Sequence, residues 1–567
     1  MTEKSITPAV EEAHPPQDVE GLEKPAAEEL QQGVRMAEAV TLSWTRTSLI
    51  IVYACMWMTY FVRALQSSLT MNLSPYITSS FEGHSLLTVI STVVSIMSAA
   101  TTMPVAKILN LWDRTVAFSF MLILSIIGLI LNAACNDIAT YCAAQVFYNV
   151  GSAGLIFSVD VLTADTSTLR NRGLAFAFTS SPYIITAFAG SPLSERFHES
   201  DWRWAYGTIT ILLPLVTLPI ILTWSFARKK AVQNHVVEKD SVQRTLPEAI
   251  KYYLIEFDAV GIFLLIAGFC LLLLPMTLAT SQPESWRTDY IIAMIVLGGV
   301  LVIAFALYEK FLSPKPFIPW HLLANRTVMG ACLVDLIYQI GYYCWAMYFT
   351  SYLQVVFDIS ITEAGYISSI FDFVSPICLI LAGYLMRVTQ RFRWLFLVAV
   401  PLYVLFAGLM IYFRAPGRGV GFIVMCEVFI GIAGGVMILC QQIAVMAASK
   451  HEDYAAMLAL LGLFGNIGGA IGNSVSGAVW TNTLPQKLAE YLPEDDLPML
   501  DSIYEDLEVQ LSYAVGTPTR DAIIAAYVDA QRNMLIAGTA IMVLAMAFVF
   551  LIKDIRLKDT RSLGMVF

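Results

Sequence analysis

The sequence predicts an all-α membrane protein with fourteen transmembrane helices. Hydrophobic residues make up 57% of the 567 residues and charged residues only 14%, and the mean hydropathy is +0.66. A soluble protein of this length carries more charge on its surface. Apolar runs of about 20 residues, the length that crosses about 30 Å of hydrocarbon, follow one another almost to the end of the chain. Such runs indicate helices that span a bilayer.

The boundaries of the expected helices can be predicted from the apolar runs to within a few residues. In the thirteenth run, Gly465 and Gly469 lie four residues apart and indicate a face for close helix packing rather than a phosphate-binding loop. We expect helices at about 47–70, 85–106, 115–134, 139–163, 173–194, 204–226, 255–278, 289–312, 327–352, 362–387, 393–413, 419–447, 455–481 and 532–553.

Hydrophilic segments divide these runs into domains. Residues 1–45 are acidic and rich in Pro, which predicts a disordered cytoplasmic tail, and they show no signal-peptide pattern. A basic linker, 227–253, follows the sixth run. We therefore expect a six-helix bundle at 46–226, an inserted helix pair at 254–312, a second six-helix bundle at 327–553 with an outer loop at 482–530, and a short cytoplasmic tail at 554–567.

The distribution of charge predicts that both termini are cytoplasmic. With the N-terminus inside, most Lys and Arg near helix ends fall on the cytoplasmic side, as they do in multi-pass proteins; Arg414 and Arg418 go against this trend. The net charge of -10 does not indicate a nucleic-acid partner, because the acids concentrate in the N-terminal tail and around 490–529. The nine cysteines lie within or beside apolar runs and predict apolar filler rather than a metal site.

Several apolar runs carry ionisable residues. An ionised side chain near the bilayer centre costs on the order of 3 kcal/mol even on lenient scales, so it should face protein or water. Six helices, a linker and a second bundle fit the plan of major facilitator transporters, in which the first and fourth helices of each bundle line a cavity. The charges on helices one, four, nine, twelve and ten are Arg63, Asp160, Asp335, Glu427 and Asp372.

These charges predict coupling of transport to protons. A carboxyl group can exchange protons near neutral pH when apolar surroundings oppose its ionisation. We expect Glu427 to be the first candidate and Asp372 the second, with Asp335 and Asp160 as further candidates. Arg63 either keeps one of these acids ionised or meets a polar substrate. Structural pairing, or a position near a helix end, is the alternative for each residue.

The ninth run is unusually aromatic and predicts a binding surface. Phenol and indole groups beside an amide suit a bulky, amide-rich and partly apolar ligand, whereas a simple ion would not need them. Packing against lipid is the alternative for some of these rings. The candidate substrate-binding residues of the bundles are Arg63 and Gln66 on helix one and Tyr338, Gln339, Tyr342, Tyr343 and Trp345 on helix nine.

The outer loop before the last helix is long and patterned. It alternates apolar and acidic residues at helical spacing between Leu497 and Leu511 and then turns at Gly516-Thr517-Pro518. A plain connector would be shorter. We expect this segment to fold as an amphipathic cover over the outer mouth.

At this loop the chain resembles a known family. Its segments 503–507, 510–513, 516–523 and 526–527 are similar to the outer loop of fungal siderophore-iron transporters. Together the matches run from helix one to helix fourteen. The further similar segments are Tyr76–Phe81, Ala106–Leu109, Ala164–Ser167 with Leu169–Arg172, Phe178–Tyr183 and Trp480–Pro485.

The resemblance implies a major facilitator protein that imports ferric siderophore complexes by proton symport, usually at a fungal plasma membrane. It also implies that Tyr504, Tyr513 and Arg520 in the outer loop take part in substrate recognition. Gly190-Ser191-Pro192 stands where drug exporters usually show a Gly-Pro pair, which argues against an antiporter. The candidate gating residues of the cytoplasmic loops are Lys107, Arg114, Asp165, Arg170 and Arg172.

We therefore expect proton-coupled import of ferric siderophore complexes of the hydroxamate type. No enzymatic activity is expected, because no nucleophile-base pair or nucleotide loop occurs. The siderophore fills the coordination sphere of the iron, so we expect no cofactor and no iron ligand from the protein. The alternatives are a proton-coupled exporter of drugs or toxins with the same fourteen-helix plan, and a siderophore receptor or sensor that does not transport. The sequence leaves open the siderophore, the number of protons, residence at the surface or in endosomal vesicles, and the oligomeric state.

Overall fold

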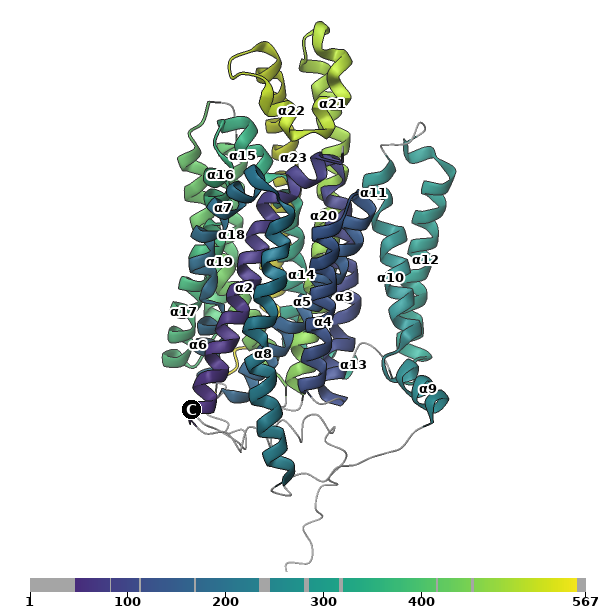
Figure 1. Ribbon diagram of the computed structural model, residues 1–567, viewed down its shortest axis with the longest axis vertical. Coiled ribbons are helices and arrows are strands. Elements are labelled where there is room, and N and C mark those ends of the chain that lie inside the picture. The colour runs from purple at the N-terminus through teal and green to yellow at the C-terminus, as the bar shows by residue number, and fades with distance from the viewer. Residues whose placement is uncertain are drawn as a thin grey trace, which may run out of the picture.

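The computed structural model describes residues 46–81, 83–111, 114–167, 170–233, 245–279, 285–315, 320–414, 417–449 and 453–557 (Figure 1). In these stretches every regular element is a helix. The expected N-terminal tail, residues 234–244 of the expected 227–253 linker and most of the C-terminal tail lie outside the described residues.

The first half of the chain forms a bundle whose helices agree closely with the apolar runs. Pro182 begins a new helix directly after Ser181, so the fifth predicted helix is divided in two. The helices are α2 (Arg46–Ser79), α3 (Leu87–Leu111), α4 (Arg114–Ala134), α5 (Ile138–Thr166), α6 (Arg172–Ser180), α7 (Pro182–Ser200) and α8 (Arg203–Gln233), with the short 3₁₀ helix η1 (His84–Leu86) between α2 and α3.

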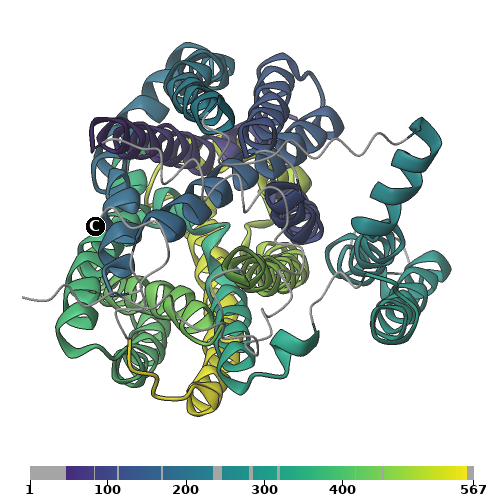
Figure 2. The ribbon, with the colours of Figure 1, turned by 90° about the horizontal axis from the view of Figure 1, so that it is seen from below.

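The next segment forms a helix pair at the side of the molecule. Figure 2 shows α10 and α12 beside each other and apart from the remaining helices. Contacts with α3 and with α20 attach this pair to the rest of the protein. The elements are α9 (Leu246–Glu256), α10 (Ala259–Leu273), α11 (Pro275–Leu278), η3 (Ser285–Arg287) and α12 (Asp289–Phe311).

The second half of the chain forms a further bundle and carries the helices at the top of Figure 1. We call the end of the molecule that bears α21 and α22 the loop end, and the other the opposite end. The elements are α13 (Trp320–Leu323), α14 (Arg326–Ala346), α15 (Phe349–Phe357), α16 (Ile361–Ser368), α17 (Ile370–Thr389), α18 (Arg393–Phe413), α19 (Val420–Ala447), α20 (Tyr454–Tyr491), η5 (Glu494–Met499), α21 (Leu500–Glu505), α22 (Leu507–Ser512), α23 (Pro518–Phe548) and η6 (Val549–Leu551).

Thirteen helical spans within the described residues are long and apolar enough to cross a membrane. The predicted ninth helix, 327–352, is not among them. It corresponds to α14 and α15, which break near Met347, and α14 is buried along most of its length. Asp335, Gln339 and the tyrosines are polar and lower the hydropathy of this segment. The segment can carry them because these side chains face the protein interior rather than lipid. The multi-pass membrane fold is confirmed, and the count of fourteen stays a prediction.

The outer loop is shorter than expected. Helix α20 continues to Tyr491 and α23 already begins at Pro518, where Thr517 caps it by accepting a hydrogen bond from the Arg520 N–H. The predicted boundaries, 482 and 530, therefore differ from the structure. The physical reason is that hydropathy detects only the apolar part of a helix, whereas α20 and α23 both continue through polar sequence. The amphipathic segment forms the short helices η5, α21 and α22.

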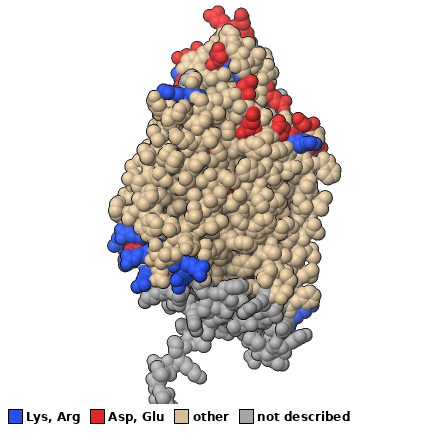
Figure 3. All heavy atoms as spheres, turned by 90° about the vertical axis from the view of Figure 1, so that its left-hand side faces the viewer, with Lys and Arg blue, Asp and Glu red and all other residues tan. Residues whose placement is uncertain are grey.

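Apolar packing follows the two halves of the chain. One cluster of buried side chains draws almost wholly on residues 49–224, and a larger one draws mainly on residues 323–557. The halves meet where α3 packs on α20 and where α6 and α7 pack on α16 and α17. Figure 3 shows, on one face, that most acidic side chains lie near the loop end and that basic side chains gather near the opposite end.

Candidate functional site

A cavity of about 550 Å³ lies between the two halves of the chain. Ligand sites usually occupy about 300–1,000 Å³. Its first-half lining comes from α2, α3, α5, α7 and the last residue of α6, and its second-half lining comes chiefly from α14 and α17. The polar and aromatic lining residues are Arg63, Ser67, Thr70, Ser74, Ser91, Ser95, Tyr141, Gln145, Tyr148, Asn149, Ser180, Tyr183, Tyr338, Gln339, Tyr342, Tyr343, Phe371, Asp372, Ser375 and Asn473.

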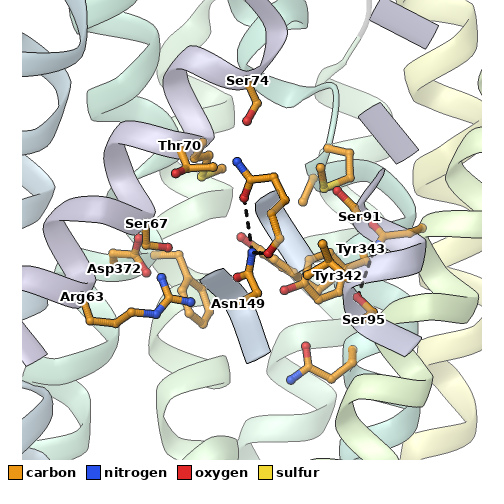
Figure 4. A pocket seen from close by; sticks show the side chains of 18 of the residues that line it. Arg63, Ser67, Thr70, Ser74, Ser91, Ser95, Asn149, Tyr342, Tyr343 and Asp372 are labelled. Atoms are coloured by element: carbon orange, nitrogen blue, oxygen red, sulfur yellow. Dashed lines mark hydrogen bonds between the residues drawn. The ribbon is translucent and has the colours of Figure 1, made fainter. Parts of the chain in front are cut away.

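The cavity contains one basic and one acidic side chain, from opposite halves. Arg63 comes from α2 and Asp372 from the first turn of α17. Within the described part of the chain no direct ion pair joins them, and the Arg63 guanidinium lies 5.6 Å from the centre of the Tyr148 ring. Figure 4 shows Arg63, Ser67 and Asp372 on one side of the cavity and Ser91, Ser95, Tyr342 and Tyr343 on the other.

Phenol rings line one wall of the cavity because α14 presents them at helical spacing. Tyr342 lies 5.3 Å from Tyr343 and 5.8 Å from Phe371 between ring centres. Gly434 of α19 makes room for this wall, since a Cβ there would lie 2.5 Å from the Phe371 ring and 3.1 Å from the Tyr338 hydroxyl. The wall therefore offers hydroxyl groups on an otherwise apolar surface.

Amides and hydroxyls form the facing wall. The Asn149 side-chain amide donates to the Gln145 backbone carbonyl at 2.8 Å, and the Gln145 amide donates to Asn132 and Tyr206, each at 3.2 Å. These bonds within the first half orient Gln145 and Asn149 toward the cavity. The arrangement can bind a large neutral molecule with many carbonyl and amide groups.

Six of the candidates line the cavity, namely Arg63, Tyr338, Gln339, Tyr342, Tyr343 and Asp372. Gln66 is fully buried and is not among the lining residues, but it donates at 3.0 Å to Thr70, which does line the cavity. Sequence reasoning missed Ser67, Ser91 and Ser95 as site residues. Their signal is a small hydroxyl recurring at helical spacing within an apolar run, which packing explains equally well.

The other three acids lie outside the cavity lining, where Asp335 and Glu427 are buried and Asp160 is partly buried. Asp160 accepts a hydrogen bond from the Tyr60 hydroxyl on α2. Asp335 faces Gly465 of α20, where a Cβ would lie 2.5 Å from a carboxylate oxygen. Glu427 is 2% exposed, and among the described residues one of its carboxylate oxygens has no hydrogen-bond partner. The expected cavity helices one, four and nine do line the cavity, whereas helix twelve contributes only Ile438.

Near Glu427 lies a buried arginine that the charge pattern left unexplained. Arg414, at the end of α18, is fully buried and donates to the Gln531 side chain. Its guanidinium stacks 4.8 Å from the centre of the Trp345 ring and 4.5 Å from that of Phe349. Arg414 thus departs from the loop-charge trend because it is buried in the bundle, and Trp345 holds it instead of lining the cavity.

The outer-loop candidates also lie away from the cavity lining. Arg520 is fully buried and donates to the Gln510 backbone carbonyl and, at 3.4 Å, to Asp358. Tyr504 and Tyr513 are partly buried against the apolar cluster of the second half. In this arrangement Arg520 holds the loop in place.

The loop end carries several contacts between the halves. The Tyr76 hydroxyl donates to Gln354 of α15, and the Leu507 N–H donates to Ser79 at 3.2 Å. Ser85 of η1 donates twice to Glu505 and accepts from the Tyr348 hydroxyl at 3.0 Å. The short loop helices therefore cover the chain between α2 and α3.

Three of the gating candidates form contacts between distant elements at the opposite end. Arg172 donates to the carbonyls of Ala164 and Ser167, at 2.9 and 3.1 Å, and stacks 4.3 Å from the Tyr454 ring of α20. Arg170 donates to the Arg387 carbonyl at 3.4 Å. The Lys107 ammonium donates to the Glu256 carbonyl of α9 at 2.6 Å. Arg114 is buried at the start of α4, and the Asp165 side chain lies outside the described residues.

Comparison with known proteins decides the family. The model of the Major Facilitator Superfamily matches residues 56–473. The chain is 55% identical over 541 residues to MFS siderochrome iron transporter D of Aspergillus fumigatus, covering 95% of this chain and 90% of that protein. The chain belongs to the siderophore-iron transporter family of the major facilitator superfamily. The transporter is also 46% identical over 544 residues to siderophore iron transporter mirB of Emericella nidulans, again covering 95% and 90%.

Solved structures support the fold of the transporter. A bacterial homolog of the human lysosomal transporter Spinster aligns with a TM-score of 0.55 at 14% identity, covering 92% of this chain and all of that one. A peptide transporter, POT, aligns with a TM-score of 0.53 at 14% identity, covering 92% and 99%. The family and the fold are those of transporters and not of enzymes.

Proposed function

We propose that this transporter imports ferric siderophore complexes of the hydroxamate type across the plasma membrane and that proton entry drives the import. The observation that carries the proposal is the cavity between the halves, where neutral phenol, amide and hydroxyl groups surround one arginine and one aspartate. The names of the relatives, siderochrome or siderophore iron transporters, support the same substrate class.

The cavity fits the organic part of such a complex. Hydroxamate siderophores present carbonyl and amide groups around an iron whose coordination sphere they already fill. The donors on α14 and α5 can bind these groups, while the rings of Tyr342 and Phe371 pack on apolar parts of the ligand. In this proposal the iron travels inside the siderophore, and no protein ligand replaces it.

Asp372 is the acid that faces the substrate, so we assign it the first role in proton coupling. It comes from the other half of the chain than Arg63 but lies on the same side of the cavity (Figure 4), and protonation would change the net charge of the cavity. Glu427, Asp335 and Asp160 stay secondary candidates because none of them lines the cavity. A potential that is negative inside favours inward movement of each proton by about 2.3 kcal/mol per 100 mV.

The charge distribution supports an orientation. The acidic loop end would face outward and the basic opposite end would face the cytoplasm, as basic residues do in most multi-pass proteins (Figure 3). Both termini would then be cytoplasmic. Alternating access requires the contacts between the halves at the two ends to break in turn, around the cavity.

Uptake of radioiron-loaded siderophores into yeast without its own siderophore carriers tests the proposal. We expect one or more hydroxamate complexes to accumulate, and we expect a protonophore to abolish the accumulation. Asp372→Asn should reduce proton-driven accumulation, whereas Asp501→Asn, on exposed α21, is the matched control and should behave like the intact protein.

The outcomes separate the alternatives. Surface expression without accumulation of any complex would contradict import, and resistance of the same cells to added toxins would then favour an exporter. Saturable binding without accumulation would favour a receptor. Accumulation that a protonophore does not change would retain import and reject proton coupling.

A further inference from the structure

The helix α9 lies across the membrane-spanning helices instead of along them. Figure 2 views α10 and α12 end-on and shows α9 lengthwise, at the outer side of the helix pair. In Figure 1, α9 lies at the level where α10 begins. This is the position of a helix in the plane of a membrane surface.

The turn between α9 and α10 is stabilised by the backbone conformation and the side-chain hydrogen bonds of Asp258. Asp258 adopts a left-handed conformation, with φ of 50°, which Asp tolerates better than most residues. Its carboxylate accepts hydrogen bonds from the Gly261 N–H at 3.1 Å and the Ser313 hydroxyl at 2.9 Å. The chain therefore changes direction at a point that is buried and hydrogen-bonded.

One face of α9 is attached to the protein. Glu256 is buried and forms an ion pair with Lys315, while its backbone carbonyl accepts from Lys107 of α3. Tyr252, one turn earlier, lies beneath the same lysine, with 5.7 Å between the Lys315 nitrogen and the ring centre. These contacts fix the rotation of α9 about its own axis.

A second face is apolar and exposed. At 3.6 residues per turn, Leu246, Ile250 and Leu254 share one side of the helix, and their exposed fractions are 78%, 54% and 55%. Glu248 and Lys251 lie on a third, mainly polar side, which also carries Ile255, 39% exposed. A helix with an attached face, a polar face and an apolar face turned away from the protein has the pattern of an interfacial amphipathic helix.

We infer that the apolar face of α9 inserts into the surface of the lipid bilayer. Lipid is the partner of this face because α9 leads directly into α10, a helix long and apolar enough to span the membrane. On α10 the apolar side chains of Val260 and Phe263 are 53% and 66% exposed, so the exposed apolar surface continues from one helix to the next. An isolated helix of 11 residues is marginal in water, although Thr245 and Glu248 form a capping box at its start. Insertion into lipid removes Leu246, Ile250 and Leu254 from water and so stabilises the helix.

The full-length protein in lipid nanodiscs tests this inference. An environment-sensitive fluorescent amino acid is introduced at position 250 in one variant and at position 251 in the other, which avoids the native cysteines. We expect the probe at 250 to show blue-shifted emission, quenching by brominated lipids and protection from aqueous iodide. The probe at 251 should show the reverse.

Two results would overturn the inference. Equal quenching of both probes by iodide would mean that the apolar face meets water. Protection of the probe at 250 from both quenchers would mean that protein covers it. As a second measurement, Ile250→Glu together with Leu254→Glu should speed amide exchange in α9 several-fold in nanodiscs, whereas Lys251→Glu should not. Unchanged exchange in the double variant would reject insertion even if the probes perturbed the helix.

Discussion

The Glu505 carboxylate accepts two hydrogen bonds from Ser85, one from its backbone N–H at 3.1 Å and one from its hydroxyl at 2.9 Å. Ser85 belongs to η1 in the first half of the chain, and Glu505 ends α21 in the second half. The pair thus joins the two halves at the loop end. Any opening of this end must separate these two residues.

The Glu505 contact predicts that mild acid favours closure of the loop end. Burial raises the pKa of Glu505 above its ordinary value, although the Ser85 hydrogen bonds oppose the shift. The closed arrangement therefore binds the proton more tightly than an open one in which Glu505 meets water. Its stability relative to the open form is greatest at low pH and is lost as pH rises through the raised pKa.

Distances between spin labels on the two halves at the loop end, measured between about pH 5 and about pH 7, check this expectation. Glu505→Gln should resemble the protonated form and lose the pH dependence. Glu494→Gln, in exposed η5, is the control and should keep it. A full pH dependence in Glu505→Gln would show that another group is responsible.

Arg520 should stabilise the loop rather than bind substrate. Arg520→Ala removes a buried guanidinium and its hydrogen bond to the Gln510 carbonyl, which should cost about 2 kcal/mol and lower the unfolding temperature. Asp358→Asn should cost less than about 1 kcal/mol, because Asp358 is 64% exposed. Thermal unfolding of the purified variants measures both. A loss of siderophore affinity in Arg520→Ala without loss of stability would instead support the recognition role implied by the family resemblance.

The phenol hydroxyls of the cavity wall should contribute to substrate affinity. Tyr342→Phe and Tyr343→Phe keep the rings and remove one hydrogen-bonding group each, worth about 1 kcal/mol, which corresponds to about fivefold in affinity. We expect KM for the ferric complex to rise by that factor in uptake assays, with little change in the maximal rate. Tyr384→Phe, at an exposed position, should have no effect. If neither cavity variant changes KM, these hydroxyls do not bind the substrate.

Gly128 should be required for the contact between α4 and α5. A Cβ there would lie 2.2 Å from the Tyr148 backbone nitrogen, and backbone cannot move aside cheaply. Gly128→Ala should destabilise the protein by about 1–3 kcal/mol and reduce uptake, since Tyr148 lines the cavity. At Gly408 a Cβ meets nothing within 4 Å, so Gly408→Ala should be neutral or slightly stabilising. Equal unfolding temperatures for the two variants would contradict the packing argument.

Much of the site was predictable because lipid imposes a simple rule on the sequence. A charge or a cluster of polar rings inside an apolar run must face protein or water, and this rule found Arg63, Asp372 and the tyrosines of α14. The rule does not state which protein surface is faced. Glu427 satisfies it by burial outside the cavity lining, Asp160 by accepting a hydrogen bond from Tyr60, and the buried Arg414 by stacking among aromatic rings.

The sequence by itself determined the membrane-spanning helices and the chemical character of the cavity, because hydropathy and intramembrane charge are properties of single segments. The tertiary structure alone decided which acid meets the cavity, that Trp345 holds Arg414, that Arg520 holds the loop, and that α9 turns across the spanning helices. These outcomes depend on the rotation of each helix against its neighbours. Packing between segments distant in the chain sets that rotation, and no local pattern records it.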